Sequence, residues 1–248
     1  MQDRGPAAYL AEFVGTLLLV FFITAAVSVY VTAPSASNPN PFIDFSVIGL
    51  VHVFVLFVLI QTLAVVSGAH FNPAVTAALT MLRQIKPPDA AIYVGVQFLG
   101  ATAGAFLTKA LLLDEGKASN YGAVAVSDAI NGKILPGMVV EGLGTFFLLW
   151  AIIGVAVNPR GTKEWAGFAI GAALGMAVMV FGPLTGAGLN PARAFGPALA
   201  SGDWGGADTF ILVYVIAPLV GALVAGLLYF QILSEPGAKG VGGAEPVG

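Results

Sequence analysis

Two copies of the tripeptide Asn-Pro-Ala are the groups of this sequence best suited to hold a small polar molecule. The six residues are Asn72, Pro73, Ala74, Asn190, Pro191 and Ala192. Proline is favoured in the first turn of a helix, and an asparagine before it caps the helix by accepting a backbone N–H with its side-chain oxygen. The amide NH₂ group then remains free and can only donate hydrogen bonds. Two such groups that face each other would hold one water molecule by its oxygen.

Arg193 follows the second tripeptide directly, whereas Val75 follows the first. A charged side chain in apolar surroundings normally faces water or a partner of opposite charge. We therefore interpret Arg193 as a group that donates hydrogen bonds to a passing solute and repels cations. The alternative is a structural ion pair between Arg193 and an acidic loop residue.

Two acidic residues, Glu12 and Glu141, lie inside long apolar segments and are functional candidates for the same reason. One interpretation is a proton relay. The favoured interpretation is that each carboxylate accepts hydrogen bonds from loop N–H groups that lipid cannot satisfy, with Gln97 assisting. The loop carbonyls would then point away from the carboxylates and form a row of acceptors.

Other site chemistry has little support in the sequence. The chain has no cysteine, and its two histidines, His52 and His70, stand outside any metal-binding motif. It also lacks the Gly-x-Ser-x-Gly pattern of a serine nucleophile, so no metal, cofactor or enzyme activity is predicted. The net charge of −3 gives no reason to expect a nucleic-acid partner. A purely structural membrane protein is the alternative that needs no site.

The elements that must position these residues are membrane-spanning helices. The chain has 248 residues, of which 58% are hydrophobic and 9% charged, against about 25% charged residues in a soluble domain. A helix needs about 20 apolar residues to cross the bilayer core. Six segments of that kind are predicted, over 8–32, 45–66, 89–113, 135–157, 165–182 and 207–233.

Two shorter apolar pieces, 73–83 and 191–200, each begin at an Asn-Pro pair. A helix of about ten residues is about 15 Å long and reaches only half-way across the membrane. We interpret these pieces as re-entrant half-helices, with two amphipathic surface turns as the alternative. The predicted fold is an all-α membrane protein of six transmembrane helices and two half-helices in a single domain over 1–248, with a flexible tail over 234–248.

The two halves of the chain, about 7–113 and 135–233, resemble each other. Residues 11–16 match 140–145, residues 68–74 match 186–192, and Tyr93 and Gly100 match Tyr214 and Gly221. Each half has three full spans, so the second half enters the membrane from the opposite side. Such an inverted repeat places its functional site near the midplane, where the positive N-terminal ends of the two half-helices would meet.

Two Gly-x-x-x-Gly patterns, Gly100–Gly104 and Gly171–Gly175, allow helices to cross at close range. The crossing could lie within one subunit or between subunits, and the sequence does not distinguish them.

Basic residues predict the orientation in the lipid bilayer, since they concentrate on the cytoplasmic side. With the N-terminus inside, the inner segments carry Arg4, Arg83, Lys86, Arg160, Lys163 and Lys239. The outer loops carry Lys117 and Lys133, with Lys109 near the end of the third span. The prediction is therefore a multi-pass protein of the plasma membrane with both termini in the cytoplasm.

In these features the chain resembles the aquaporin, or major intrinsic protein, family. The resemblance runs from about residue 7 to 233 and rests on the two Asn-Pro-Ala motifs, the paired glutamates, and the continuation Arg193-Ala194-Phe195-Gly196-Pro197. It implies a passive channel for water or small neutral solutes that excludes protons and ions. It also implies a homotetramer with one pore in each subunit.

The family forms its narrowest point from four positions, which by spacing correspond to His52, Val178, Ala187 and Arg193. Water-selective members usually have an aromatic residue at the first position and histidine at the second, so this set is a departure. Resemblance also assigns His70 to the inner part of the pore, although bracing of the loop is the alternative.

The predicted solute is water, with some permeability to small neutral solutes. Glycerol-conducting members usually carry aspartate after the arginine of the second motif, and this chain has Ala194. Tyr214 is typical of water channels, but Val215 is not. The alternatives are a glycerol or small-solute facilitator and, from a different class, a proton-coupled transporter that would use Glu12 or Glu141.

Overall fold

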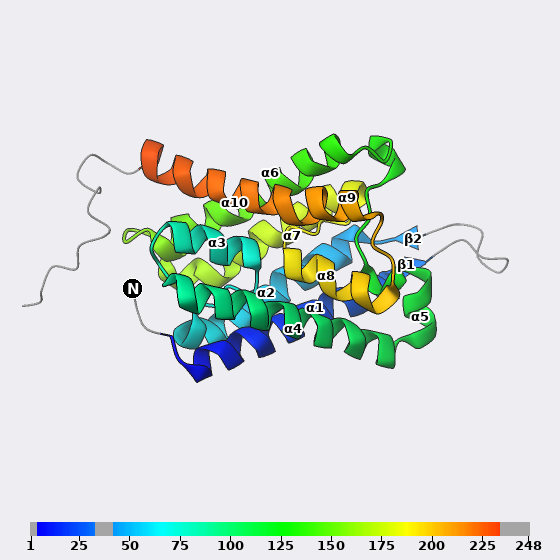
Figure 1. The fold of residues 1–248 in the computed structure, drawn as a ribbon, viewed down its shortest axis with the longest axis horizontal. Helices are drawn as coiled ribbons and strands as arrows, with labels where there is room; N and C mark the ends of the chain where they lie inside the picture. Colours follow the sequence, from blue (N-terminus) through cyan, green and yellow to red (C-terminus); the bar gives the residue numbers. More distant parts are fainter. Residues whose placement is uncertain (1–3, 33–41, 234–248) are drawn as a thin grey trace, which may run out of the picture.

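The computed structural model describes residues 4–32 and 42–233, and the described residues form a bundle of long apolar helices (Figure 1). Predictions for the tail over 234–248, including Lys239, lie outside the described residues. Six helices are long and apolar enough to cross a membrane. The spans are Pro6–Tyr30, Phe45–Ser67, Pro87–Leu111, Ile134–Val157, Lys163–Thr185 and Ala207–Gln231. The predicted six-span fold is confirmed, with ends that differ by only a few residues.

The first three spans are the single helices α1 (Pro6–Tyr30), α2 (Phe45–Ser67) and α4 (Pro87–Leu111). The fourth is α6 (Ile134–Ile152) with a π-helical end, Ile153–Val157. The fifth is α7 (Ala166–Thr185), preceded by a 3₁₀ turn, Lys163–Trp165. The sixth runs through α9 (Ala207–Thr209), a π-helical stretch (Phe210–Ile216), α10 (Ala217–Leu228) and a last π-helical turn (Tyr229–Leu233).

The sixth span is widened by a proline. Pro218 has no N–H to donate, and its ring crowds the carbonyl four residues earlier, that of Tyr214. The π-helical stretch Phe210–Ile216 ends just before Pro218, so this local widening accommodates the ring inside a membrane span.

Short elements outside the spans were not predicted. The strands β1 (Val31–Thr32) and β2 (Phe42–Ile43) form a two-residue antiparallel ladder. The long connection after α4 contains α5 (Leu113–Ala118) and two 3₁₀ turns, Asn120–Gly122 and Asp128–Ile130. We call the end of the bundle with β1 and β2 the hairpin end, and the opposite end, where α1 begins, the N-terminal end (Figure 1).

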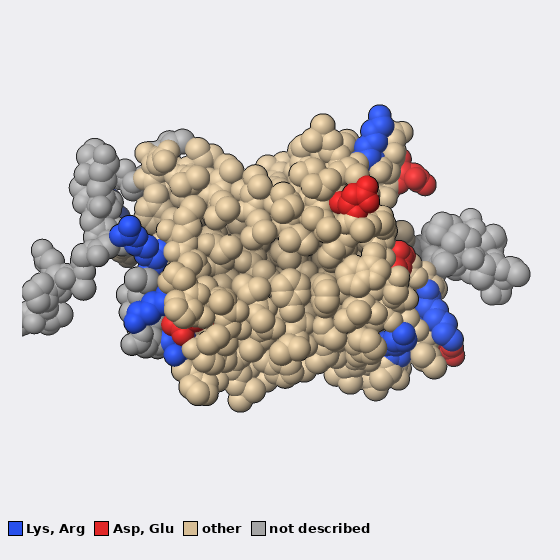
Figure 2. Space-filling model, viewed as in Figure 1, with Lys and Arg blue, Asp and Glu red and all other residues tan. Residues whose placement is uncertain are grey.

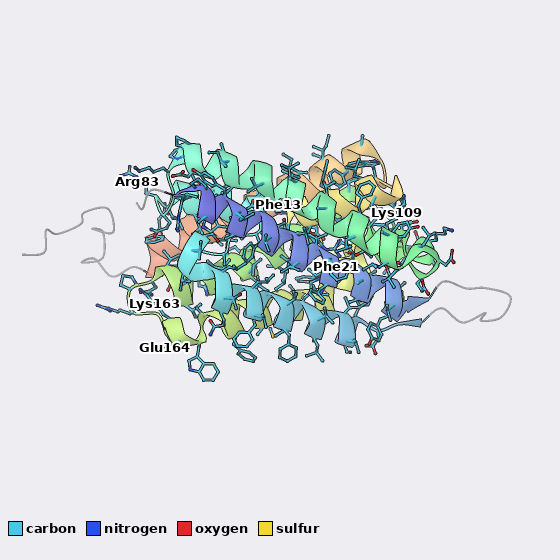
Figure 3. All side chains as sticks on the ribbon, turned by 90° about the horizontal axis from the view of Figure 1, so that it is seen from below. Phe13, Phe21, Arg83, Lys109, Lys163 and Glu164 are labelled. Carbon is cyan, nitrogen blue, oxygen red and sulfur yellow. The ribbon has the colours of Figure 1, made fainter. Side chains whose placement is uncertain are left out.

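Charged side chains gather at these two ends and leave a broad uncharged band between them (Figure 2). Arg83, Lys163 and Glu164 lie at the N-terminal end, and Lys109 lies at the hairpin end (Figure 3). The sixth span also finishes at the N-terminal end (Figure 1). This arrangement is that of an integral, multi-pass membrane protein.

The two predicted half-helices are α3 (Pro73–Met81) and α8 (Pro191–Ser201). Each begins near the centre of the bundle, and they run toward opposite ends (Figure 1). Each packs against the third long helix of the other half, α3 against α10 and α8 against α4. The two halves are therefore interlocked around the point where the half-helices meet.

Glycines allow the long helices to approach closely within the subunit. A Cβ on Gly100 or Gly104 would run into the backbone carbonyls of Phe13 and Leu17 on α1, and a Cβ on Gly171 would run into that of Val53 on α2. The crossings α1–α4 and α2–α7 therefore use both Gly-x-x-x-Gly patterns, which answers the question that the sequence left open.

Gly15 and its repeat counterpart Gly144 leave room for the side chains of the re-entrant loops. A Cβ on Gly15 would overlap the ring of the fully buried Phe71, and a Cβ on Gly144 would overlap Leu189. We expect Gly15→Ala to lower the free energy of unfolding by about 1–3 kcal/mol, as overpacking of a core does. Thermal unfolding in detergent measures this, with Gly95→Ala as the matched control.

Gly95 lies on α4, and a Cβ there would meet nothing within 4 Å. Because alanine is a better helix former than glycine, Gly95→Ala should be neutral or slightly stabilising. Equal stability of the two variants would contradict the close packing between α1 and the loop.

Candidate functional site

The two asparagines cap their half-helices as predicted from the Asn-Pro pairs. The side-chain oxygen of Asn72 accepts the N–H of Ala74 at 2.8 Å. That of Asn190 accepts the N–H groups of Ala192 and Arg193 at 3.0 and 3.2 Å. The oxygen atoms are thus committed to the helices, and the NH₂ groups face the opposite half.

The prediction that both NH₂ groups stay free is wrong in part. Asn72 donates one hydrogen to the carbonyl of Leu189 at 2.9 Å, and Asn190 donates one to the carbonyl of Phe71 at 2.8 Å. An amide NH₂ carries two hydrogens, so each asparagine keeps one for another acceptor. Sequence reasoning missed the cross-bonds because they join the two halves through main-chain carbonyls, which no residue type reveals.

Glu12 accepts four hydrogen bonds, two of them from N–H groups of the loop before α3. One carboxylate oxygen accepts the hydroxyl of Ser67 and the N–H of His70 at 2.7 and 2.9 Å. The other accepts the N–H of Phe71 and the Nε2–H of Gln97 at 2.7 and 2.8 Å. Because every partner is a donor, this environment fits an ionised carboxylate, which can only accept.

Glu141 has a similar environment in the second half, with three hydrogen bonds and, among the described residues, no counterpart of Gln97. One oxygen accepts the hydroxyl of Thr185 and the N–H of Gly188 at 2.6 and 2.8 Å, and the other accepts the N–H of Leu189 at 2.6 Å. The tyrosine pair completes the symmetry, since Tyr93 donates to the carbonyl of Ser67 and Tyr214 to that of Thr185. These are the contacts that a bracing role requires.

The braced loops hold unusual backbone conformations. Ala69 and Phe71 have φ of 53° and 50°, and Ala187 and Leu189 have φ of 47° and 53°. Such left-handed conformations are unfavourable for residues with a side chain, by about 1–2 kcal/mol each. The carboxylates bond N–H groups of these loops and the capping asparagines bond their carbonyls, so we expect the loop conformations to depend on Glu12 and Glu141.

Two cavities meet inside the bundle. The first, about 300 Å³, runs from Arg4, Gln84 and Val157 at the N-terminal end to the centre, where Asn72 and Asn190 line it. The second, about 360 Å³, opens near Val31 and Ile43 at the hairpin end. His52 and Arg193 line both cavities, so the junction between them lies at these two side chains.

The junction pairs one acceptor with one donor. Nδ1 of His52 lies 2.7 Å from the carbonyl of Ile48, so this nitrogen carries the hydrogen of the neutral ring and Nε2 is an acceptor. Arg193 donates from Nη1 to the carbonyl of Gly122 at 3.0 Å. Neither Nε2 of His52 nor Nε of Arg193 has a protein partner among the described residues. The predicted alternative for Arg193, an ion pair with a loop acid, is not seen within the described chain.

Val178 and Ala187 lie at the same level. Ala187 lines the first cavity and is almost fully buried. Val178 is buried between Leu174, which lines the first cavity, and Gly182, which lines the second. These three α7 residues are spaced four apart and share one helix face. Val178 is itself absent from both cavity walls, so it backs the junction from α7.

His70 lies where either of its two predicted roles would place it. It lines the first cavity, and its main-chain N–H is one of the groups that Glu12 accepts. Its Nδ1 lies 3.1 Å from the hydroxyl of Thr76. The same hydroxyl accepts a hydrogen bond from Nε2 of Gln97 at 3.0 Å. Gln97 therefore connects the carboxylate of Glu12 to α3, in the bracing position that the sequence suggested.

A network at the hairpin end fixes the carbonyl that Arg193 uses. Lys109 on α4 donates to the carbonyl of Ala200, near the end of α8, at 2.6 Å, and its Nζ lies 5.3 Å from the ring centre of Tyr121. Asn120 donates to Asp203 at 2.6 Å. The turn that carries Gly122 is thus bound to the end of α8, the helix that carries Arg193.

Sequence reasoning did not identify Ser67, Thr185, Lys109 or the carbonyl of Gly122. Ser67 and Thr185 extend the internal repeat by one position, which is a signal that the alignment of the halves contained. The Lys109 network joins segments far apart in the chain and left no such signal. Among the described residues, no three His, Cys, Asp or Glu side chains come close enough to hold a metal ion.

Comparison with known proteins places the chain among relatives of the same length and fold. The family model described as "Major intrinsic protein" matches residues 5–229. Aquaporin AqpM of Methanothermobacter marburgensis is 34% identical over 240 residues, which cover 91% of this chain and 97% of the relative. Glycerol uptake facilitator protein-like 6 of Lactiplantibacillus plantarum is 38% identical over 219 residues, which cover 88% and 94%.

A solved structure has the same fold. The X-ray structure of the aquaglyceroporin from Plasmodium falciparum aligns with a TM-score of 0.75 at 24% identity, over 92% of this chain and 96% of that one. At this identity the likeness supports the fold alone.

Glu141→Gln tests the bracing of the second loop. The substitution replaces one accepting oxygen by an NH₂ group. This group can only donate, so it cannot accept hydrogen bonds from the N–H groups that it faces. We expect the free energy of unfolding to fall by about 1.5–3 kcal/mol, the contribution of a hydrogen bond to a charged group. Thermal unfolding in detergent measures this, and the exposed Glu115→Gln is the control. Unchanged stability of Glu141→Gln would show that the loop does not depend on the carboxylate.

Lys109→Met tests the network behind Arg193. Methionine keeps the length of the side chain but removes the bond to Ala200 and the cation over Tyr121. We expect a fall in melting temperature of about 2–4 °C, as a loss of about 1 kcal/mol gives in a chain of this size, and a higher glycerol-to-water permeability ratio in liposomes. Lys117→Met, which removes an exposed pair with Asp114, should change neither. Lower stability with an unchanged ratio would restrict Lys109 to a structural role.

Proposed function

Since this chain belongs to the major intrinsic protein family, we propose that it is a passive channel for water, with some permeability to small neutral solutes. The observation that carries the proposal is the pair of cavities that meet at His52 and Arg193, the first of them lined by both capping asparagines. Together the two cavities extend from the N-terminal end of the bundle to the hairpin end.

At the centre, Asn72 and Asn190 each keep one N–H for the cavity. A water molecule that accepts both must direct its own hydrogens away from the asparagines, along the pore in each direction. A proton wire needs the donor and acceptor roles to pass along the chain of waters, so it is interrupted here. The positive N-terminal ends of α3 and α8 add a potential that opposes protons and other cations.

At the junction, a solute can donate to Nε2 of His52 and accept from Nε of Arg193. The fixed positive charge of Arg193 opposes cations. The hydrogen bond from its Nη1 to the carbonyl of Gly122 keeps the guanidinium in place. Water satisfies both groups with one molecule, so it can replace the hydrogen bonds that it loses on entering the pore.

The second candidate is a glycerol or small-solute facilitator. It is supported by the small side chain of Ala187 beside the junction, which leaves an apolar side for carbon-bound hydrogens, with Val178 behind the wall. One relative is named a glycerol uptake facilitator protein-like protein. Ala194 after Arg193 supports the water channel instead, by the resemblance described above.

A proton-coupled transporter is the less suitable class. Such a transporter needs a carboxylate that exchanges protons with the solute path. The walls of the two described cavities include neither Glu12 nor Glu141, and both carboxylates are fully buried behind the loops. Each accepts several donors, so bracing accounts for their presence in the membrane.

Assembly and orientation complete the proposal. We propose a homotetramer in the plasma membrane, as in the family, with both termini in the cytoplasm and the whole chain acting as one channel domain. The orientation is supported by the basic residues at the N-terminal end, which by position include Arg4, Arg83, Lys86, Arg160 and Lys163. The hairpin end would then face outward.

Stopped-flow light scattering of proteoliposomes tests the function. We expect the wild type to shrink after an osmotic jump far faster than empty liposomes, with a low activation energy and slower glycerol entry. His52→Phe removes the acceptor and should lower glycerol permeability by about fivefold or more, the effect of one lost hydrogen bond of about 1 kcal/mol. Water permeability should change less, because water stays bonded to its neighbours in the file.

Val58→Phe is the matched control, since Val58 lies on the exposed face of the same helix. Wild-type shrinkage no faster than that of empty liposomes would contradict the water channel. Glycerol entry that exceeds water flow would support the facilitator instead.

A further inference from the structure

A second arginine lies in the pore wall, at the end opposite to Arg193. Arg4 lines the first cavity at the N-terminal end, where Gln84, Val157 and Ala166 form the neighbouring wall. Its Nη1 donates to the carbonyl of Val66, near the end of α2, at 3.4 Å. Its Nε is buried and has no partner among the described residues. Because Arg4 lines this cavity, its guanidinium brings a full positive charge to this part of the pore.

The main chain of Arg4 is attached to a different helix from the one that its side chain reaches. Asp89 on α4 accepts the N–H of Arg4 at 3.5 Å and the hydroxyl of Tyr9 at 2.6 Å. The hydroxyl oxygen of Tyr9 also lies 3.4 Å from the carbonyl oxygen of Arg4. The side chain thus extends from the α1–α4 side of the bundle to α2, and these contacts define its position.

The guanidinium also lies close to the braced loop. A Cβ on Gly68 would stand 3.3 Å from Nη2 of Arg4 and 3.4 Å from Nε2 of His70. Gly68 has φ of +87°, a conformation that favours glycine, and the missing side chain leaves the space that these two groups share. Arg4 is therefore directly beside the wall that leads to Asn72.

We propose that Arg4 is a specificity-determining residue, which forms a second barrier to cations at the N-terminal mouth of the pore. This inference rests on the proposed channel function. Arginine remains protonated under all physiological conditions, and a pore with low-dielectric walls focuses the field of such a charge. The solute path then has an arginine on each side of the asparagine pair, one from α8 and one from the segment before α1.

The proposal makes the two arginines partly redundant. Loss of Arg193 alone should leave Arg4 and the half-helix N-termini in place, and loss of Arg4 alone should leave Arg193. Only the variant that lacks both should admit cations readily. If the junction were the single barrier to cations, loss of Arg193 alone would cause the leak, and the further loss of Arg4 would not increase it.

The experiment measures K⁺ and proton leak in proteoliposomes for Arg4→Gln, Arg193→Val and the double variant. We expect each single variant to leak close to the wild-type level. The double variant should leak at least about tenfold more than Arg193→Val, as the loss of a potential of several kT predicts. Arg4→Lys in the Arg193→Val background keeps the charge and should restore the low leak.

Lys163→Gln in the same background is the matched control, because it removes a positive charge from the same end but from outside the cavity walls. A double variant that leaks no more than Arg193→Val would overturn the proposal, and so would equal leaks for Arg4→Gln and Lys163→Gln in that background. Arg4→Ala repeats the test if the glutamine variant does not fold. Water flow through the wild type, recorded in the same vesicles, tests the channel function separately.

Discussion

Each re-entrant loop buries main-chain N–H groups at a depth where lipid offers no acceptor, and the rest of the pore depends on how these groups are satisfied. Glu12 and Glu141 supply the acceptors from the first helix of each half. In each loop two successive N–H groups bond one carboxylate, one to each of its oxygens. The glutamates therefore hold each loop in place before the half-helix that its Asn-Pro pair begins.

Phe71 and Leu189 show how the two halves are joined. The N–H of each is bonded by the glutamate of its own half, and the carbonyl of each is bonded by the asparagine of the other half. A left-handed conformation lets one residue direct its two polar groups toward these different partners. The strain is thus part of the joint between the repeats, and the free asparagine hydrogens are aligned as a consequence.

Most of the fold could be predicted from the sequence because it depends on patterns that the sequence displays. Apolar length defines the six spans, Asn-Pro pairs define the half-helix starts, and the repeat defines the inversion. The site was predicted where side chains act, as with Arg193 and Glu141. It was not predicted where single main-chain carbonyls accept side-chain hydrogen bonds, because the carbonyls of Gly122 and Phe71 carry no residue-type signal, and their positions follow only from tertiary packing.

The scaffold is symmetric, whereas the walls of the pore are not. The paired glutamates, tyrosines and glycines lie behind the walls, and they recur in both halves. At the cavity surface three pairs differ, since Arg193 corresponds to Val75, His52 to Ile170, and His70 to Gly188, whereas the asparagine pair and apolar pairs such as Leu56 and Leu174 recur. Discrimination between neutral solutes must therefore come from the positions where the repeat is broken. Arg4 adds to this asymmetry from outside the repeat, because it brings to the N-terminal mouth the positive charge that Val75 does not supply.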